Sequence, residues 1–190
     1  MDSVLQHLMP FFDTWEARFL RRVSSQFKKA VADHPWTTCQ PIRGKIQSWR
    51  TCFPNATIAS CWADYFPRKT PVLDSDLAYF VGLKELNVSD QSISDNALVP
   101  FSERGIHTLN VSNCQNLTDG IFQYLKHTQD LNVSSCWQIT GSGFVHIKGI
   151  PKLDIRYCLG LDKDNLVHLV NVKCLLMTEE ESPSDNMWDW

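Results

Sequence analysis

The residues best suited to chemistry in this sequence are cysteines that recur after short apolar segments, at Cys61, Cys114, Cys136 and Cys158, with Gln91 at the matching place of one unit. Thiolates are good zinc ligands. Ligands for one ion must converge on a point, however, whereas residues one repeat apart lie in a row. We therefore predict buried structural thiols at these positions, and no metal site.

Histidines and acids show no catalytic arrangement. The six histidines fall at different repeat positions, and no Gly-x-Ser-x-Gly, P-loop or His-Glu-x-x-His motif is present. Asp95, Asp119 and Asp164 recur at one place after a strand, where capping explains them better than catalysis. We expect Ser94, Thr118 and Thr140 to cap the helices beside them. The sequence predicts a protein that is not an enzyme and holds no cofactor.

The cysteines belong to a periodic array whose four clearest copies are Leu86-Asn-Val-Ser, Leu109-Asn-Val-Ser, Leu131-Asn-Val-Ser and Leu153-Asp-Ile-Arg. Their leading leucines are 23, 22 and 22 residues apart. The Leu-x-Val alternation indicates a strand with one buried face, and a short helical pattern follows each strand. A fifth copy ends at Met177. A degenerate copy over 53–61 has Ala56 at the leucine position, Ile58 at the valine position and Cys61 at the cysteine position. The period predicts a solenoid, which is a surface for binding.

These units resemble the cysteine-containing leucine-rich repeats, and Cys114-Gln-Asn-Leu-Thr-Asp119 is the best match. The resemblance covers residues 53–178 and implies an α/β fold, a short solenoid of parallel strands plus helices. The inward strand face is usually the binding surface of such arrays. It would carry the candidate substrate-binding residues Asn87, Ser89, Asn110, Ser112, Asn132, Ser134, Asp154, Arg156 and Tyr157.

Residues 1–36 break the period and place apolar side chains mostly at helical spacing, interrupted at Pro10 and Asp13, so they predict three short helices. One interpretation is a cap over the open end of the solenoid. The other is an F-box, because Val23-Ser-Ser-Gln-Phe27 with Val31, followed by Trp36, resembles the second part of that motif. The Leu-Pro that usually opens the motif is replaced here by Met1-Asp2-Ser3.

The F-box resemblance implies the substrate-recognition subunit of an SCF-type cullin-RING ubiquitin ligase. The F-box would dock into a Skp-type adaptor and the repeats would bind a protein substrate. Its adaptor-binding residues would be Leu5, Leu8, Val23, Phe27 and Val31, some of which must instead pack against the solenoid. The alternative is a leucine-rich-repeat interaction scaffold of the same fold without a link to ubiquitin.

The bulk composition limits the class of partner. A net charge of -3 and a pI near 6.0 argue against general nucleic-acid binding, and no apolar run approaches the ~20 residues that span a bilayer. Seven cysteines without a recognisable secretory signal favour reduced thiols in the cytoplasm or nucleus. Residues 37–52 are predicted to be a degenerate first unit or connector, and residues 179–190 an acidic disordered tail.

Overall fold

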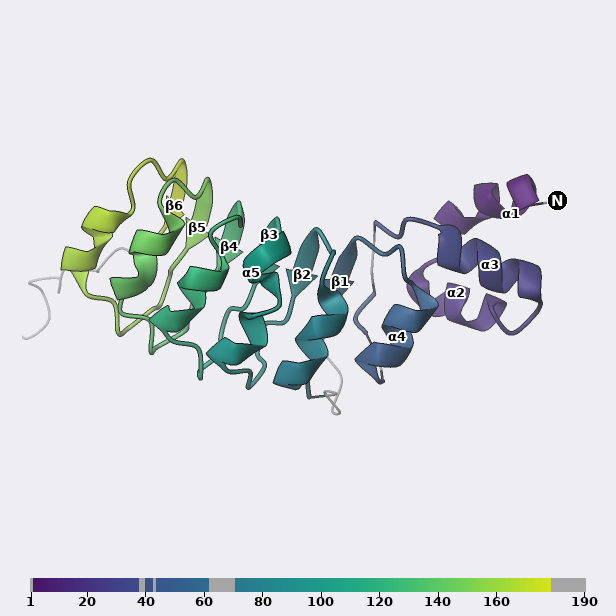
Figure 1. The fold of residues 1–190 in the computed structure, drawn as a ribbon, viewed down its shortest axis with the longest axis horizontal. Coiled ribbons are helices and arrows are strands. Elements are labelled where there is room, and N and C mark those ends of the chain that lie inside the picture. The colour runs from purple at the N-terminus through teal and green to yellow at the C-terminus, as the bar shows by residue number, and fades with distance from the viewer. Residues whose placement is uncertain (1, 38–39, 43, 62–70, 179–190) are drawn as a thin grey trace, which may run out of the picture.

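The computed structural model describes residues 2–37, 40–42, 44–61 and 71–178, so the predicted acidic tail at 179–190 lies outside the described residues. Its strands form one six-stranded parallel sheet in the order β1-β2-β3-β4-β5-β6. The chain is elongated, with helices α1–α3 at one end and strand β6 near the other (Figure 1). The expected α/β solenoid with a parallel sheet is confirmed.

Three helices, α1 (Asp2–Leu8), α2 (Thr14–Leu20) and α3 (Ser25–Asp33), form the N-terminal end, which we call the helical head. A single 3₁₀ turn, η1 (Met9–Phe11), contains Pro10 and separates the first two helices. The Asp13 carboxylate accepts a hydrogen bond from the Glu16 amide, and Ser24 accepts one from the Phe27 amide, so both later helices begin at side-chain caps. The three predicted helices are confirmed.

A chain of aromatic rings joins the head to the solenoid. The indole of Trp36 packs edge-on against Phe53, with ring centroids 5.5 Å apart. Trp49, in helix α4 (Ile46–Cys52), lies against both Phe53 and Phe80. Backbone hydrogen bonds from Thr57 to Trp36 and from Ile42 to Ser60 place the connector beside the first strand. Because these rings are large and buried, helix α4 is packed against its neighbours and is not part of a free linker.

The strands are three residues long and occur once per unit: β1 (Ile58–Ser60), β2 (Glu85–Asn87), β3 (Thr108–Asn110), β4 (Asp130–Asn132), β5 (Lys152–Asp154) and β6 (Cys174–Leu176). Their register aligns the repeat leucines, with Leu86 beside Leu109, then Leu131, Leu153 and Leu175. The first four of these are fully buried, and stacking them builds one continuous core that no single unit could form.

The segments after the strands are mostly 3₁₀ helices: η2 (Asp74–Phe80), η3 (Asp95–Leu98), η4 (Asp119–Tyr124), η5 (Ser142–Ile147) and η6 (Lys163–His168). One short α-helix, α5 (Phe101–Arg104), follows η3. A 22-residue unit leaves few residues for the helical side of the solenoid. The 3₁₀ helix is usually short, so it suits a segment of this length. The expected helix per unit is present, in this compressed form.

The upstream degenerate unit has a different register from the expected one. Ala59 pairs with Leu86 and Ile58 pairs with Glu85, so Ala59 occupies the leucine position instead of Ala56. Cys61 consequently stands level with Val88, outside the column of the other three cysteines. The sequence alignment was wrong here because it was anchored on the cysteine, whereas backbone pairing sets the register.

Candidate functional site

The repeat cysteines form a buried ladder along the solenoid. The thiols of Cys114, Cys136 and Cys158 donate to carbonyls of the preceding unit, at Val88, Val111 and Val133, over 3.2 to 3.3 Å. Burial raises the pKa of these thiols, to about 12 for Cys136 and about 11 for the other two. They stay protonated donors, in keeping with the predicted structural role.

Gln91 takes the place of the missing cysteine by hydrogen bonding in two directions. Its amide nitrogen donates to the Ser89 carbonyl, and its amide oxygen accepts from the backbone of Val72. In the unit that has no thiol, a larger polar side chain therefore satisfies one carbonyl of the turn and the distant backbone amide of Val72.

A second ladder of carboxylates links successive units. Each Asp accepts hydrogen bonds from the backbone amide and the hydroxyl of a residue in the next unit, in the pairs Asp74–Ser94, Asp95–Thr118 and Asp119–Thr140. The hydroxyls were expected to cap helices. Of the three, Thr118 accepts from the Gly120 amide and Thr140 accepts from the Ser142 amide, although Gly141 is the residue at the N-cap of η5, and Ser94 makes no such cap. These three aspartates therefore link successive units of the solenoid by hydrogen bonds.

The asparagine column of the strand face is occupied by local hydrogen bonds. The side chains of Asn87, Asn110, Asn132 and Asp154 each accept from the backbone amide two residues later, over 2.9 to 3.1 Å. Of the nine candidate substrate-binding residues, Ser89 and Asp154 are buried, and Asn87, Asn110, Asn132, Ser112 and Ser134 are half-buried. This column sets the turn after each strand.

Arg156 and Tyr157 are the two candidates on this face that extend into solvent. The Arg156 guanidinium forms two hydrogen bonds with the Asp154 carboxylate, at 2.6 and 3.0 Å. Burial acts to raise the pKa of Asp154, but the hydrogen bonds and charge of Arg156 outweigh it, so the pKa lies below its usual value. Tyr157 is 59% exposed and has a left-handed backbone with φ of 59°.

Two exposed apolar residues beside Tyr157 were missed by the sequence analysis. Trp137 and Leu159 each follow a buried cysteine and are 57% and 79% exposed. Ser92 and Gln115 hold the matching places in the preceding units. The sequence signal that could have identified Trp137 and Leu159 is this change from polar to apolar residues at one repeat position. Together with Tyr157, Trp137 and Leu159 form what we call the aromatic rim.

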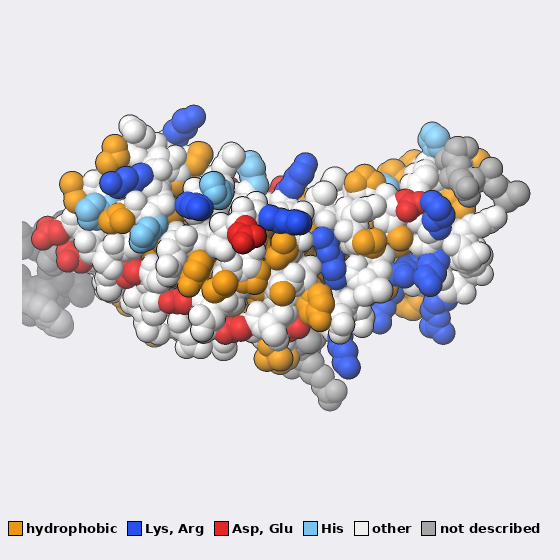
Figure 2. Space-filling view, in the orientation of Figure 1, with side chains coloured by type: hydrophobic (Ala, Val, Ile, Leu, Met, Phe, Trp, Pro, Cys, Tyr) orange, Lys and Arg blue, Asp and Glu red, His pale blue; other side chains and the backbone are white. Residues whose placement is uncertain are grey.

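Basic groups gather along one edge of the solenoid, in the segments that lead from each helix into the next strand. Figure 2 shows Lys, Arg and His toward the upper side of the solenoid and acids toward the lower side. Five exposed cations in these segments or at the end of the helix before them make no ion pair with a described carboxylate: Lys84, Arg104, Lys126, Lys148 and Lys173. Of the histidines that looked scattered in the sequence, His107 and His127 lie in the same segments, and His146 and His168 lie in the last turns of η5 and η6.

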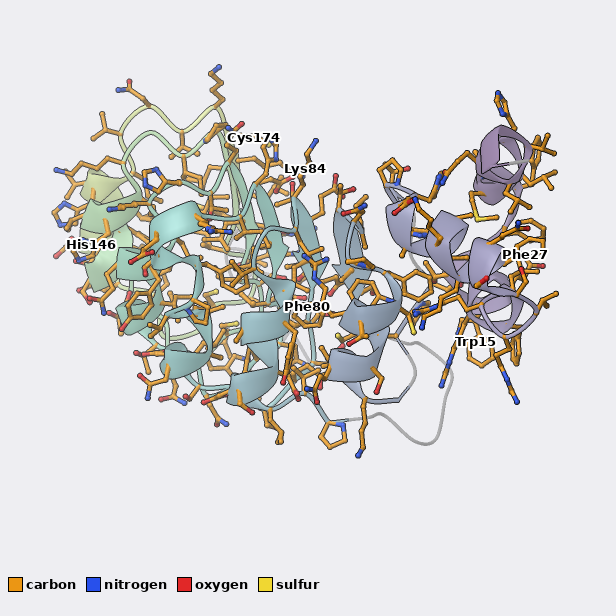
Figure 3. All side chains as sticks on the ribbon, turned by 45° about the vertical axis from the view of Figure 1, so that its right-hand side comes forward. Trp15, Phe27, Phe80, Lys84, His146 and Cys174 are labelled. Carbon is orange, nitrogen blue, oxygen red and sulfur yellow. The ribbon has the colours of Figure 1, made fainter. Side chains whose placement is uncertain are left out.

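The head divides the five expected adaptor-binding residues into two sets. Leu8 and Val23 are 40% and 68% exposed, so they are available to a partner. Leu5 and Phe27 are partly buried against the core, and Val31 is fully buried. Figure 3 places Phe27 on the head, away from the solenoid residues Phe80 and Cys174. Val31 belongs to the core of the head because its carbonyl also accepts the indole hydrogen bond of Trp36, at 2.8 Å.

The most exposed apolar residues of the head are not among the five predicted adaptor-binding residues. Phe11 is 81% exposed, Val4 is 60% exposed and Phe19 is 57% exposed. With Leu8 and Val23 they form what we call the apolar head surface. Helical spacing identified them as apolar positions but could not say which of them the short helices bury against one another.

The described residues contain no cluster of three or more potential metal ligands, and none of their helices is long and apolar enough to cross a bilayer.

Comparison with known proteins gives a likeness of fold. No protein family and no curated protein matches this sequence. Among solved structures, a chain in the crystal structure of the Rad7 and Elc1 complex in yeast is similar over 89% of this chain, with a TM-score of 0.53 and 16% sequence identity. This chain spans 57% of the length of that chain. The neighbour therefore supports an α/β fold like that of a leucine-rich-repeat solenoid.

Proposed function

We propose that this protein is the substrate-recognition subunit of an SCF-type ubiquitin ligase, in which the helical head binds a Skp-type adaptor and the solenoid binds a protein substrate. It would perform no chemistry itself and would act by holding a substrate near the ubiquitin-charged partner. The chain found to be similar in fold comes from a complex of Rad7 and Elc1. This agrees with the proposal that the present chain binds a partner protein.

The observation that carries the proposal is the apolar head surface. Small helices bury apolar side chains where they can, yet Phe11, Phe19 and Val23 are each more than half exposed in the head. The buried rings of Trp36 and Phe53 join the head to the solenoid, whereas exposed Phe19 lines an open cavity beside helix α4. Large apolar side chains left exposed on a folded domain often mark protein-binding sites, and aromatic side chains are frequent anchors of such sites.

The substrate would bind along the strand face and the aromatic rim. Six strands about 4.8 Å apart give a face roughly 24 Å long, which suits a short peptide or one helix. Trp137, Tyr157 and Arg156 are residue types that often dominate binding energy, and they occupy adjacent turns of the solenoid. The asparagine column contributes less, because its side chains already accept hydrogen bonds from their own turns.

The test is binding of the purified chain to a Skp-type adaptor by isothermal titration calorimetry. Val23→Asp is the informative variant, and Val167→Asp is its matched control, because these valines are 68% and 72% exposed at opposite ends of the chain. We expect wild type and the control to bind equally, and Val23→Asp to bind roughly tenfold more weakly or worse. Absence of binding by folded wild type would contradict the proposal.

The second candidate function is a scaffold of the same fold, with a head that only caps the solenoid. The burial of Val31 and Trp36 favours this candidate, because it shows that part of the F-box-like pattern serves the core of the head. The two functions differ in one outcome: a scaffold would bind substrate through the aromatic rim and would leave the adaptor unbound.

A further inference from the structure

A cavity of about 560 Å³ opens where the helical head meets helix α4. Its walls come from helices α2, α3 and α4 and from the turn between α2 and α3, and its size is within the range of small-molecule sites. We call it the junction cavity. It is lined by Trp15, Arg18, Phe19, Arg21, Arg22, Lys28 and Cys52.

The junction cavity holds a concentration of uncompensated positive charge. Four of its seven lining residues are cations, and none is Asp or Glu. Within the described part of the chain, Arg18, Arg21, Arg22 and Lys28 take part in no ion pair. Lys29, one position further along α3, pairs instead with Asp33. Like charges gathered in a concave site attract an anion more strongly than the same charges spread over a convex surface.

Two buried donors in this region lack hydrogen-bond acceptors among the described residues. The Nη1 atom of Arg21 is buried without a partner among the described atoms, and so is the Nε1 atom of Trp49. Trp49 is 92% buried and lines a second, smaller cavity that shares Trp15, Arg18 and Cys52 with the first. A buried donor without an acceptor is unfavourable. Because guanidinium charge is delocalised, an anion on the outer nitrogens of Arg21 would also offset its buried nitrogen.

Two aromatic rings complete the site. The rings of Trp15 and Phe19 lie 6.4 Å apart at 51° to one another, and Figure 3 shows Trp15 on the side of the head nearest helix α4. Guanidinium groups match the oxygens of a phosphate in paired hydrogen bonds, and three such groups with one ammonium could neutralise a multiply charged anion. We propose that the junction cavity binds a small phosphate-bearing anion.

The experiment titrates the full chain with inorganic pyrophosphate by calorimetry at constant ionic strength. The test variant is Arg21→Gln/Arg22→Gln, and the control is Lys126→Gln/Lys148→Gln, which removes the same charge from exposed residues on the solenoid. We expect saturable one-site binding, weakened at least roughly tenfold in the test variant and less than about twofold in the control. Absence of saturable binding by wild type, or equal weakening in both variants, would overturn the proposal.

A second readout covers the case in which Arg21→Gln disturbs folding. Cys52 lines the cavity and is a free thiol, so bound pyrophosphate should slow its alkylation in the wild-type protein, as followed by peptide mass spectrometry. Arg22→Gln, at an exposed position, should abolish most of that protection. An alkylation rate unchanged by pyrophosphate would count against the site. Neither assay contains an adaptor, so failure here is distinguishable from failure of the ligase proposal.

Discussion

The carboxylate of Asp119 joins two units of the solenoid by accepting hydrogen bonds from both the amide and the hydroxyl of Thr140, at 2.8 and 2.7 Å. Its other oxygen accepts from the amides of Gly141 and Gly143. One side chain thus satisfies three backbone donors at the start of η5, where no helical partner exists for them. Hydrogen bonds to Asp119 therefore hold neighbouring units together in addition to the apolar core.

We predict that Asp119→Asn lowers the free energy of unfolding by about 1 to 3 kcal/mol, because an amide nitrogen cannot accept these hydrogen bonds. The matched control is Asp164→Asn, an aspartate at a similar place in the last unit whose carboxylate accepts no hydrogen bond from a described residue. Urea denaturation followed by circular dichroism measures both. Equal effects of the two substitutions would contradict a linking role for Asp119.

The buried thiols make stability fall at alkaline pH. Burial raises the pKa of Cys136 from 9.0 to about 12, so the unfolded chain releases this proton first as the pH rises. The protonated thiol therefore contributes its full stability below about pH 9 and loses it progressively up to about pH 12. We expect the cost of Cys136→Ala to be about 1 kcal/mol smaller at pH 10 than at pH 8.

Val133→Ala is the control for this alkaline effect, since it shortens a buried side chain that does not titrate. Its cost should be the same at both pH values in guanidinium denaturation. A pH-independent cost for Cys136→Ala would show that the thiol titrates alike in the folded and unfolded chain.

His34 should make stability fall at acidic pH. Burial against the head lowers the pKa of its imidazole below 6.5, and its ring lies 4.6 Å from that of Trp36. The unfolded chain then binds the proton first as the pH falls, so the contribution of neutral His34 is complete above about pH 6.5 and is lost below it. Thermal unfolding between pH 7 and pH 5 should show a shallower decline for His34→Gln than for wild type. Parallel curves would rule out His34 as the group responsible.

Gly143 is required by close packing between η4 and η5. A Cβ atom there would lie 2.4 Å from the Asp119 carbonyl oxygen and 2.6 Å from the Phe122 ring. We predict that Gly143→Ala destabilises the protein by about 1 to 3 kcal/mol, because backbone must move to admit the methyl group. Ser142→Ala, at the exposed neighbouring position, should change the melting temperature little. Similar melting temperatures for the two variants would mean that the units separate easily.

The solenoid was predictable because its signals are local and repeated. The alternation within each Leu-x-Val segment indicates which face of that strand is buried. A step of 22 or 23 residues between segments then aligns Leu109 with Leu131 and Leu153, and no long-range contact has to be known in advance. The same logic failed for Cys61. One unit departs from the period there, and inter-strand hydrogen bonds rather than residue type decide the register.

The candidate sites were less predictable because they depend on which residues the tertiary structure brings together or leaves uncovered. Apolar spacing in the head could not distinguish buried Val31 from exposed Val23, since short helices cross at angles that only packing decides. The junction cavity joins Arg21 to Cys52, thirty-one positions apart, and no local pattern records that approach.

The sequence alone therefore determined the parallel strands, their stacked leucine core and the buried cysteine ladder, because a periodic chain repeats one short-range pattern of burial. Only the tertiary structure decided that the aspartates bind the next unit, that asparagines close their own turns, and that cations converge at the head. These features depend on distances between side chains of different units, and a distance between units follows from packing geometry rather than from residue order.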